Sequence, residues 1–241
     1  MLDHERRKLI DQVGITIAID GPAGSGKSTV SKIVAERLGI GCLDTGAMYR
    51  ALTWFALESG IDLTDQEAVR RCADDLPLIM DSHPRNPRLW VGETEVTSDI
   101  RDPRIALAIK HVSTNLAVRK WMAIEQRRRM MEARERGSGM VAEGRDITTV
   151  VCPDADVRVL LLADQEARLK RRTLEIYGDT RPEHLEIVRE QVEGRDQADS
   201  TVSEFMTPAP GVDVVDSTGL DVDAVVEGVL ALVDTNLTAR A

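Results

Sequence analysis

Aromatic residues are scarce in this sequence, at 3% of 241 residues. Proteins that bind single-stranded nucleic acid stack bases on aromatic side chains, so the scarcity argues against that function. A basic excess is absent as well, because the formal net charge is −10, whereas surfaces that bind duplexes or anionic membranes are rich in lysine and arginine. We therefore expect neither a nucleic acid nor a membrane as a partner. An anionic substrate would have to be bound by arginines and lysines that are concentrated locally.

Cysteine and histidine are also few, with three and four residues respectively. They lie far apart and form no pair with the spacing of zinc ligands, so the sequence does not favour a zinc site. No apolar run approaches the roughly eighteen residues of a membrane span. The charged residues 1–13 lack the apolar core of a signal peptide. We accordingly expect a cytoplasmic protein and interpret residues 1–13 as an N-terminal extension.

Strands and helices alternate along the rest of the chain. Residues 15–20 are rich in β-branched side chains and predict a strand, and apolar residues from Val30 to Leu38 recur with the period of a helix. Further buried strands are expected at residues 40–43, 140–142, 157–163 and 212–215. This alternation predicts an α/β fold, with a parallel five-stranded sheet flanked by helices on both faces. We expect one domain over residues 14–241.

One region departs from the alternation. Short strand-like pieces at residues 76–80, 88–91 and 93–96 are separated by prolines and a glycine, and they predict a small antiparallel insertion. The helical pattern that follows, at residues 104–136, exceeds an ordinary helix, and we expect it to break near Asn115.

A further helix is expected at residues 45–59, before the insertion. In the second half of the chain, helices are expected at residues 165–176, 182–193 and 222–233. The final residues, 234–241, are expected to fray, as chain ends commonly do.

The segment from Gly21 to Ser28 fits the pattern G-x4-G-K-[ST] and lies between the first predicted strand and the first predicted helix. Glycines let successive backbone N–H groups surround a polyphosphate, and the helix N-terminus adds partial positive charge. Lys27 supplies a mobile charge for the β- and γ-phosphates, and the Ser28 hydroxyl can ligate Mg²⁺. The motif predicts an ATP site with Mg²⁺ as cofactor, formed by Gly21, Pro22, Ala23, Gly24, Ser25, Gly26, Lys27, Ser28 and Thr29.

Arginines beside carboxylates follow this motif in three clusters, at residues 44–50, 143–146 and 195–200. The first two come directly after predicted strands, whose carboxyl ends are where ligands bind in such sheets. The third comes after the helix predicted at 182–193. Each cluster alone also fits a structural role, as a helix cap, a salt bridge or a charged helix end. Asn-Lys-x-Asp for guanine and an apolar strand ending in Asp-Glu are both absent, and a small anionic acceptor suits the clusters better.

The motifs together resemble the bacterial cytidylate kinase family over residues 15–233. The resemblance rests on IDGPAGSGKST, LDTGAMYRA, IRDP, EGRDITTVV, RD-x-x-DS and VDST, with the small β insertion. It implies a P-loop kinase that transfers a phosphoryl group from ATP to CMP or dCMP. It also implies an NMP-binding insertion at about residues 61–118 and a short helical lid at about residues 168–185.

The resemblance further implies how the acceptor is bound. Arg50 and Arg145 would hold its phosphate, in a site that also includes Asp44 and Thr45. Arg119 and Asp146 would recognise the cytosine edge, which is chemically reasonable because a carboxylate accepts from the N4 amino group.

The sugar and the transferring group are assigned in the same way. Arg195 and Asp199 would hold the sugar hydroxyls. Three arginines of the lid, Arg168, Arg171 and Arg172, fall where the family brings guanidinium groups to the transferring phosphoryl group; an exposed basic helix face is the alternative. The predicted catalytic residues are Lys27, Arg145, Arg168 and Arg172. The acceptor phosphate is itself the nucleophile, so no protein base is expected.

The sequence departs from the family pattern at three positions. Val202 replaces an arginine that many members carry, Lys110 stands where a serine often contacts the base, and Thr148 replaces a glycine. These changes bear on base selectivity and acceptor affinity rather than on reaction type. Two alternatives share the P-loop: a kinase for UMP or another small acceptor, and a P-loop switch that is not a kinase. We expect a monomer.

Overall fold

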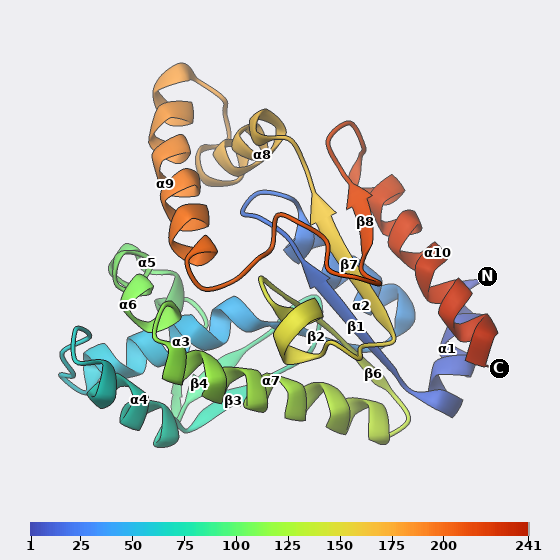
Figure 1. Ribbon diagram of the computed structural model, residues 1–241, viewed down its shortest axis with the longest axis horizontal. Helices are drawn as coiled ribbons and strands as arrows, with labels where there is room; N and C mark the ends of the chain where they lie inside the picture. Colours follow the sequence, from blue (N-terminus) through green and yellow to red (C-terminus); the bar gives the residue numbers. More distant parts are fainter. Residues whose placement is uncertain (241) are drawn as a thin grey trace.

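The computed structural model describes residues 1–240, and the side chain of Arg195 lies outside that description. Within this range, five parallel strands form one sheet in the order β2-β6-β1-β7-β8. Their bounds are Gly41–Asp44 for β2, Gly139–Gly144 for β6, Ile15–Asp20 for β1, Val157–Leu162 for β7 and Asp213–Asp216 for β8. The central strand β1 is buried at every residue because helices cover both of its faces (Figure 1). The expected α/β fold is confirmed.

Alternate residues of β1 face two different hydrophobic clusters. Ile15, Ile17 and Ile19 pack with apolar side chains of α1 (Asp3–Val13), α2 (Lys27–Leu38) and α10 (Val222–Arg240). Ala18 belongs to the cluster of α3 (Thr45–Glu58) and α7 (Leu116–Glu135) on the other face. This period of two along the strand divides the core into two layers.

Both chain ends are held against the body of the protein, and Figure 1 shows them side by side at α1 and α10. Arg6, whose side chain is buried, donates to Asp234 Oδ1 at 2.7 Å. Arg240 pairs with Asp156 at 3.0 Å and donates to the Val13 carbonyl at 2.9 Å. The expectation that residues 234–241 fray is therefore wrong over the described part, because these ion pairs fix the last turns of α10.

The region between α3 and α7 contains the expected antiparallel sheet. Its strands are β3 (Leu78–Met80), β4 (Leu89–Val91) and β5 (Thr94–Glu95), preceded by α4 (Gln66–Asp74). Three short helical segments follow, η1 (Asp99–Arg101), α5 (Pro103–Ala108) and α6 (Lys110–Ser113). The helix break expected near Asn115 is confirmed: its side chain accepts from the Ala117 and Val118 amides and caps α7.

Helices α8 (Gln165–Tyr177) and α9 (Pro182–Ser200) lie together beyond the carboxyl end of β7 (Figure 1). The sequence placed the end of the second helix at residue 193, which is wrong by about two turns. Gly194 does not adopt a positive φ and lies inside the helix. The RD-x-x-D motif is consequently on α9 rather than beyond it. A single π-helical turn at Ile147–Val151 was not expected either.

None of the helices in the described part of the chain combines the length and apolarity that a membrane span requires.

Candidate functional site

The carboxyl ends of three neighbouring strands bring acidic residues to one edge of the sheet. In the β2–β6 ladder Asp44 is opposite Glu143, and in the β1–β6 ladder Asp20 is opposite Gly144. Gly144 is required there, since a Cβ atom would lie 2.7 Å from Thr45 Oγ1. The Thr45 hydroxyl instead donates to the Glu143 carbonyl at 2.7 Å. The first two predicted clusters thus meet at the P-loop edge of the sheet.

The P-loop connects β1 to α2 as the motif predicts. Gly26 is the N-cap of α2 with a φ of 93°, a left-handed conformation that glycine adopts without strain. Lys27 Nζ donates to the Pro22 carbonyl at 3.1 Å, so the lysine lies along its own loop. The loop amides and the positive end of α2 face the same edge as the acidic strand ends, an arrangement suited to an anion.

Ser28 and Glu143 form a direct link between the P-loop and β6. The Ser28 hydroxyl donates to Glu143 Oε1 at 2.6 Å. Burial raises the pKa of Glu143, and the nearby negative charge of Asp44 raises it further. A hydroxyl oxygen and a buried carboxylate are hard donors of the type that Mg²⁺ takes in small number beside phosphate oxygens. The chemistry of these two side chains therefore fits a magnesium ion, with Glu143 as a candidate second group beside Ser28.

Arg50 extends from α3 toward Asp44. Its Nη2 donates to Asp44 Oδ2 at 3.0 Å, and its Nε is buried without a hydrogen-bond partner among the described residues. Burial alone would raise the pKa of Asp44, but the Arg50 charge and the Ala47 amide outweigh it and the pKa is lowered. The structure thus places Arg50 at the same strand end as Glu143, with a donor that a phosphate oxygen could satisfy.

Arg145 joins β6 to α9 and to the P-loop. Its Nε donates to Asp199 Oδ2 at 3.0 Å, its Nη2 to Asp196 Oδ1 at 3.1 Å, and its Nη1 to the Gly21 carbonyl. The guanidinium lies over the Phe205 ring, 4.5 Å from the centroid. With a side chain only 11% exposed, Arg145 is held on several sides at the centre of the predicted site.

Arg119 and Asp146 are brought together although 27 residues separate them. Arg119 Nη2 donates to Asp146 Oδ2 at 2.6 Å, and Arg119 Nη1 donates to the Ser113 carbonyl at 3.1 Å. Burial raises the pKa of Asp146 more than the Arg119 charge lowers it. Burial also raises the pKa of Tyr49, and the neighbouring charge of Asp146 adds to this. Tyr49, part of LDTGAMYR, is thus a further neighbour of the pair.

Asp20, at the end of β1, was not among the predicted site residues. Its carboxylate accepts from the Ile147 amide at 3.0 Å and from the Thr148 amide and hydroxyl, both at 2.7 Å. Burial raises the pKa of Asp20 to about 6. The Thr148 departure therefore adds one hydrogen bond to a buried carboxylate, which fixes the turn directly after Arg145 and Asp146.

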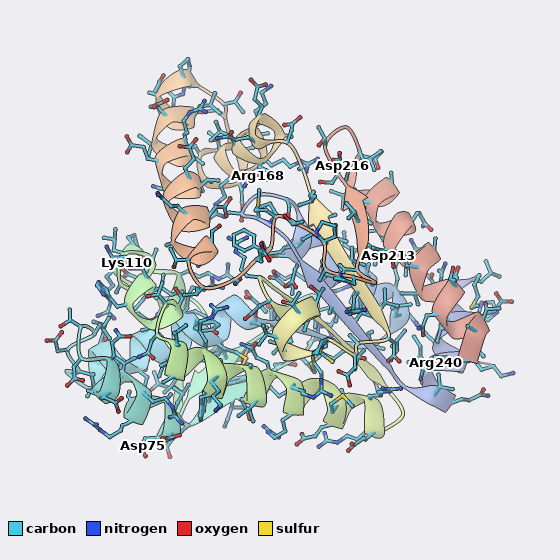
Figure 2. All side chains as sticks on the ribbon, viewed as in Figure 1. Asp75, Lys110, Arg168, Asp213, Asp216 and Arg240 are labelled. Atoms are coloured by element: carbon cyan, nitrogen blue, oxygen red, sulfur yellow. The ribbon has the colours of Figure 1, made fainter. Side chains whose placement is uncertain are left out.

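The three arginines expected in the lid, Arg168, Arg171 and Arg172, have different surroundings. Arg168 donates to the Ala23 carbonyl at 3.0 Å and to Asp196, and Figure 2 labels it beside α8. Arg171 donates to the Ser217 hydroxyl at 2.8 Å, in the VDST motif. Arg172 pairs with Glu175 on its own helix at 2.7 Å. In this conformation Arg168 is the one of the three that reaches the P-loop.

The remaining predicted residues are more peripheral or lie outside the description. Lys110 is exposed on α6, where Figure 2 labels it (Figure 2). Val202 follows the end of α9 and is half-buried. The side chain of Arg195 lies outside the described residues, so the predicted sugar contact stays a prediction.

Two further residues of the site, Glu143 and Asp196, could have been found from the sequence. Glu143 directly follows the apolar strand predicted at residues 140–142, a position at which P-loop proteins can carry a carboxylate on the metal side. Asp196 lies inside the RD-x-x-D motif, whose first and last residues alone were assigned. Asp20 offered no such signal, because its partners lie 127 and 128 residues away.

A model of the family described as cytidylate kinase matches residues 17–235. The chain belongs to the cytidylate kinase family. A curated cytidylate kinase from Cutibacterium acnes is 44% identical over 224 residues, which cover 92% of this chain and 97% of the relative. A cytidylate kinase from Geobacillus kaustophilus is 38% identical, with 92% and 98% covered.

Some family members carry this unit within a longer chain. A bifunctional pantoate ligase/cytidylate kinase from Synechococcus sp. (strain CC9902) is 39% identical over 221 residues, which cover 90% of this chain but 44% of that protein. The chain thus matches nearly the full length of some relatives and under half of the bifunctional one.

Proposed function

We propose that this cytidylate kinase family member phosphorylates CMP and dCMP at the expense of ATP, giving CDP and dCDP. The observation that carries the proposal is the family match over residues 17–235, in which the P-loop and all three arginine clusters fall. The resemblance in motifs predicted the same reaction from the sequence. The geometry adds that these clusters converge on one edge of the sheet.

On the donor side, the P-loop amides, the N-terminus of α2 and Lys27 would bind the ATP phosphates. We further propose Mg²⁺ as the cofactor, held by Ser28 with Glu143 beside it. When bound, the ion supplies positive charge to the β- and γ-phosphate oxygens. Glu143 fixes the direction of the Ser28 hydroxyl, so the serine oxygen presents a lone pair away from β6.

On the acceptor side, Arg50 and Arg145 would bind the monophosphate of CMP through charge-assisted hydrogen bonds. The buried Arg119–Asp146 pair would recognise cytosine, with the Asp146 carboxylate accepting from the N4 amino group. Asp199, with Arg195, would bind the sugar. Lys27, Arg145, Arg168 and Arg172 would neutralise charge as the phosphoryl group moves to an acceptor oxygen that is already anionic.

Water must be excluded for the transfer to compete with hydrolysis of ATP. Helices α8 and α9 carry residues 168–185, the proposed lid, and the segment 61–118 carries the proposed NMP-binding insertion. Both border the acidic edge of the sheet, so closure over the two substrates would shield it. This division of the chain stays a prediction, as do a monomeric state and a cytoplasmic location.

An acceptor panel tests the proposal. ATP consumption coupled to ADP release is measured with CMP, dCMP, UMP, AMP, GMP and shikimate in turn. We expect the highest kcat/KM with CMP or dCMP. Efficient turnover with UMP alone would favour the pyrimidine alternative, and turnover only with a purine monophosphate or shikimate would refute the assignment. ATP binding without any acceptor-dependent turnover would indicate a P-loop switch.

A further inference from the structure

The Asp196 carboxylate, near the end of α9, is shared by the P-loop and two arginines. Its Oδ1 accepts from the Ala23 backbone N–H and from Arg145 Nη2, both at 3.1 Å. Its Oδ2 accepts from Arg168 Nη1. The Asp196 side chain is 14% exposed, so these charge-assisted hydrogen bonds are largely shielded from salt and water.

Further contacts hold α8 and α9 against the P-loop. A Cβ atom on Gly24 would lie 2.6 Å from the Arg168 carbonyl oxygen, and Gly24 has a φ of 76°. Arg168 Nη1 also donates to the Ala23 carbonyl at 3.0 Å. An apolar cluster of Leu169, Val188 and Val192 packs against Ala23. Helices α8 and α9 therefore dock directly on the loop that is expected to hold ATP.

The donors that Asp196 engages are of the types that bind phosphate. A P-loop amide and two guanidinium groups are the usual partners of phosphate oxygens. The Arg168 side chain is only 9% exposed, and its Nε is buried with no hydrogen-bond partner among the described residues. That nitrogen is an unsatisfied donor beside the carboxylate. An anion larger than a carboxylate could satisfy it as well.

We propose that Asp196 is a positioning residue whose carboxylate competes with a nucleotide phosphate for the Ala23 amide, Arg145 and Arg168. The proposal deepens the function given above and rests on it. A carboxylate and a phosphate are both anionic acceptors, so they cannot occupy the same donors together. Phosphate binding displaces Asp196 and loosens residues 190–200 of α9 from the P-loop, beyond the proposed lid at 168–185. Asp196 re-engages the two arginines when the product leaves. The residue thereby keeps both guanidinium groups aligned on the P-loop between turnovers.

Magnesium-free pyrophosphate is the probe for the first test, since its binding needs neither CMP nor turnover. Calorimetric titration compares the wild type with Asp196→Asn and Asp196→Glu. We expect Asp196→Asn to lower the dissociation constant about tenfold, because a negative charge beside the anion is removed. Asp196→Glu keeps the charge and should bind much as the wild type does.

Glu193→Gln is the matched control, because it removes one charge from the same helix about one turn earlier. Glu193 is 51% exposed and accepts from Gln165 Nε2, away from the P-loop. We expect its pyrophosphate affinity to stay within about twofold of the wild type, since exposed charges are screened. Unchanged or weaker binding by Asp196→Asn, or no binding by any of the proteins, would overturn the proposal. Failure of CMP phosphorylation alone would overturn the proposed function and not this result.

Hydrogen exchange on the wild-type protein tests the displacement without any substitution. With pyrophosphate present, amides of residues 190–200 should exchange faster, since α9 loses its contact with the P-loop. Amides of residues 22–28 should exchange more slowly because they bind the anion. Slower exchange in both segments would contradict competition and would show that Asp196 and phosphate bind together. This measurement decides the question even if Asp196→Asn does not fold.

Discussion

The Ser28 hydroxyl donates a hydrogen bond of 2.6 Å to Oε1 of Glu143, 115 residues further along the chain. The bond joins the first turn of α2 to the end of β6, and it orients the serine oxygen that the P-loop motif assigns to Mg²⁺. Glu143 lies opposite Asp44 in the neighbouring strand. The proposed magnesium position therefore depends on the register of the sheet as much as on the P-loop itself.

Glu143→Gln should weaken Mg²⁺ binding about 10- to 100-fold, because residues that orient a metal ligand commonly contribute this much. The glutamine keeps the size of the side chain but removes the negative charge. Titration of Mg²⁺ into the complex with ADP, followed by calorimetry, measures the effect apart from turnover. Glu166→Gln, on the exposed surface of α8, serves as the control. An unchanged magnesium affinity in Glu143→Gln would refute the role given to Glu143.

Arg145→Ala should lower kcat/KM for CMP by about a thousandfold, a loss typical of an arginine that stabilises phosphoryl transfer. Arg145→Lys should recover little of it, because an ammonium group cannot reproduce the forked contacts to Asp196 and Asp199. Steady-state kinetics with far-UV circular dichroism separates activity from folding. Arg136→Ala, at a side chain that is 78% exposed, should be nearly neutral. Near-normal turnover in a folded Arg145→Ala protein would contradict its place in the site.

Asp146→Asn should reduce the preference for CMP over UMP by about tenfold or more, since a base contact of this kind contributes roughly 1–3 kcal/mol. An asparagine amide can donate to the O4 atom of uracil, whereas the carboxylate accepts from the N4 amino group of cytosine. The ratio of kcat/KM values for the two nucleotides measures the change. Asp154→Asn, at an exposed carboxylate that pairs with Arg127, should leave the ratio as it is. If both variants gave the wild-type ratio, Asp146 would not recognise the base.

Asp20 should make stability fall as the pH rises from about 4 to about 6. Burial raises the pKa of Asp20 from an ordinary value of 3.8 to about 6, so in this range the folded state binds the proton more tightly than the unfolded state. The contribution of Asp20 to the free energy of unfolding is greatest below pH 4 and is lost above pH 6, a change of about 3 kcal/mol. Asp20→Asn lacks this titration. The difference in unfolding free energy between the two proteins, from denaturant titrations at pH 4 to 7, should therefore change by this amount.

The opposite slope would be a free energy of unfolding that rises with pH in the wild type relative to Asp20→Asn. It would show that the hydrogen bonds from Ile147 and Thr148 outweigh burial. A flat difference would show that Asp20 does not change its pKa on folding. Either result would contradict the predicted loss of stability with rising pH.

The strands and the P-loop could be predicted because their signals are local. Residues 15–20 match β1, and the helix break expected near Asn115 lies between α6 and α7. The helix predicted at residues 182–193 stops directly before Gly194, whereas α9 continues to Ser200. Here Val192 is buried and Asp196 is held by the P-loop, so contacts on both sides carry α9 through Gly194.

The contacts within the site could not be predicted in the same way. Arg145 was assigned to the acceptor phosphate, but its bonds to Asp196 and Asp199 join segments more than 50 residues apart. The ordered end of α10 likewise depends on Arg6, 228 residues away. Pairings of this kind follow from the three-dimensional fold, for which periodicity and motif spacing carry no signal.

Phosphorus NMR of a mixture of ATP, Mg²⁺, CMP and the enzyme tests the central claim most directly. The account predicts that the signals of ADP and CDP grow at equal rates and that inorganic phosphate stays near the level without enzyme, since the site positions the acceptor and excludes water. ATP loss that yields inorganic phosphate in place of CDP, or no ATP loss when CMP is added, would contradict it.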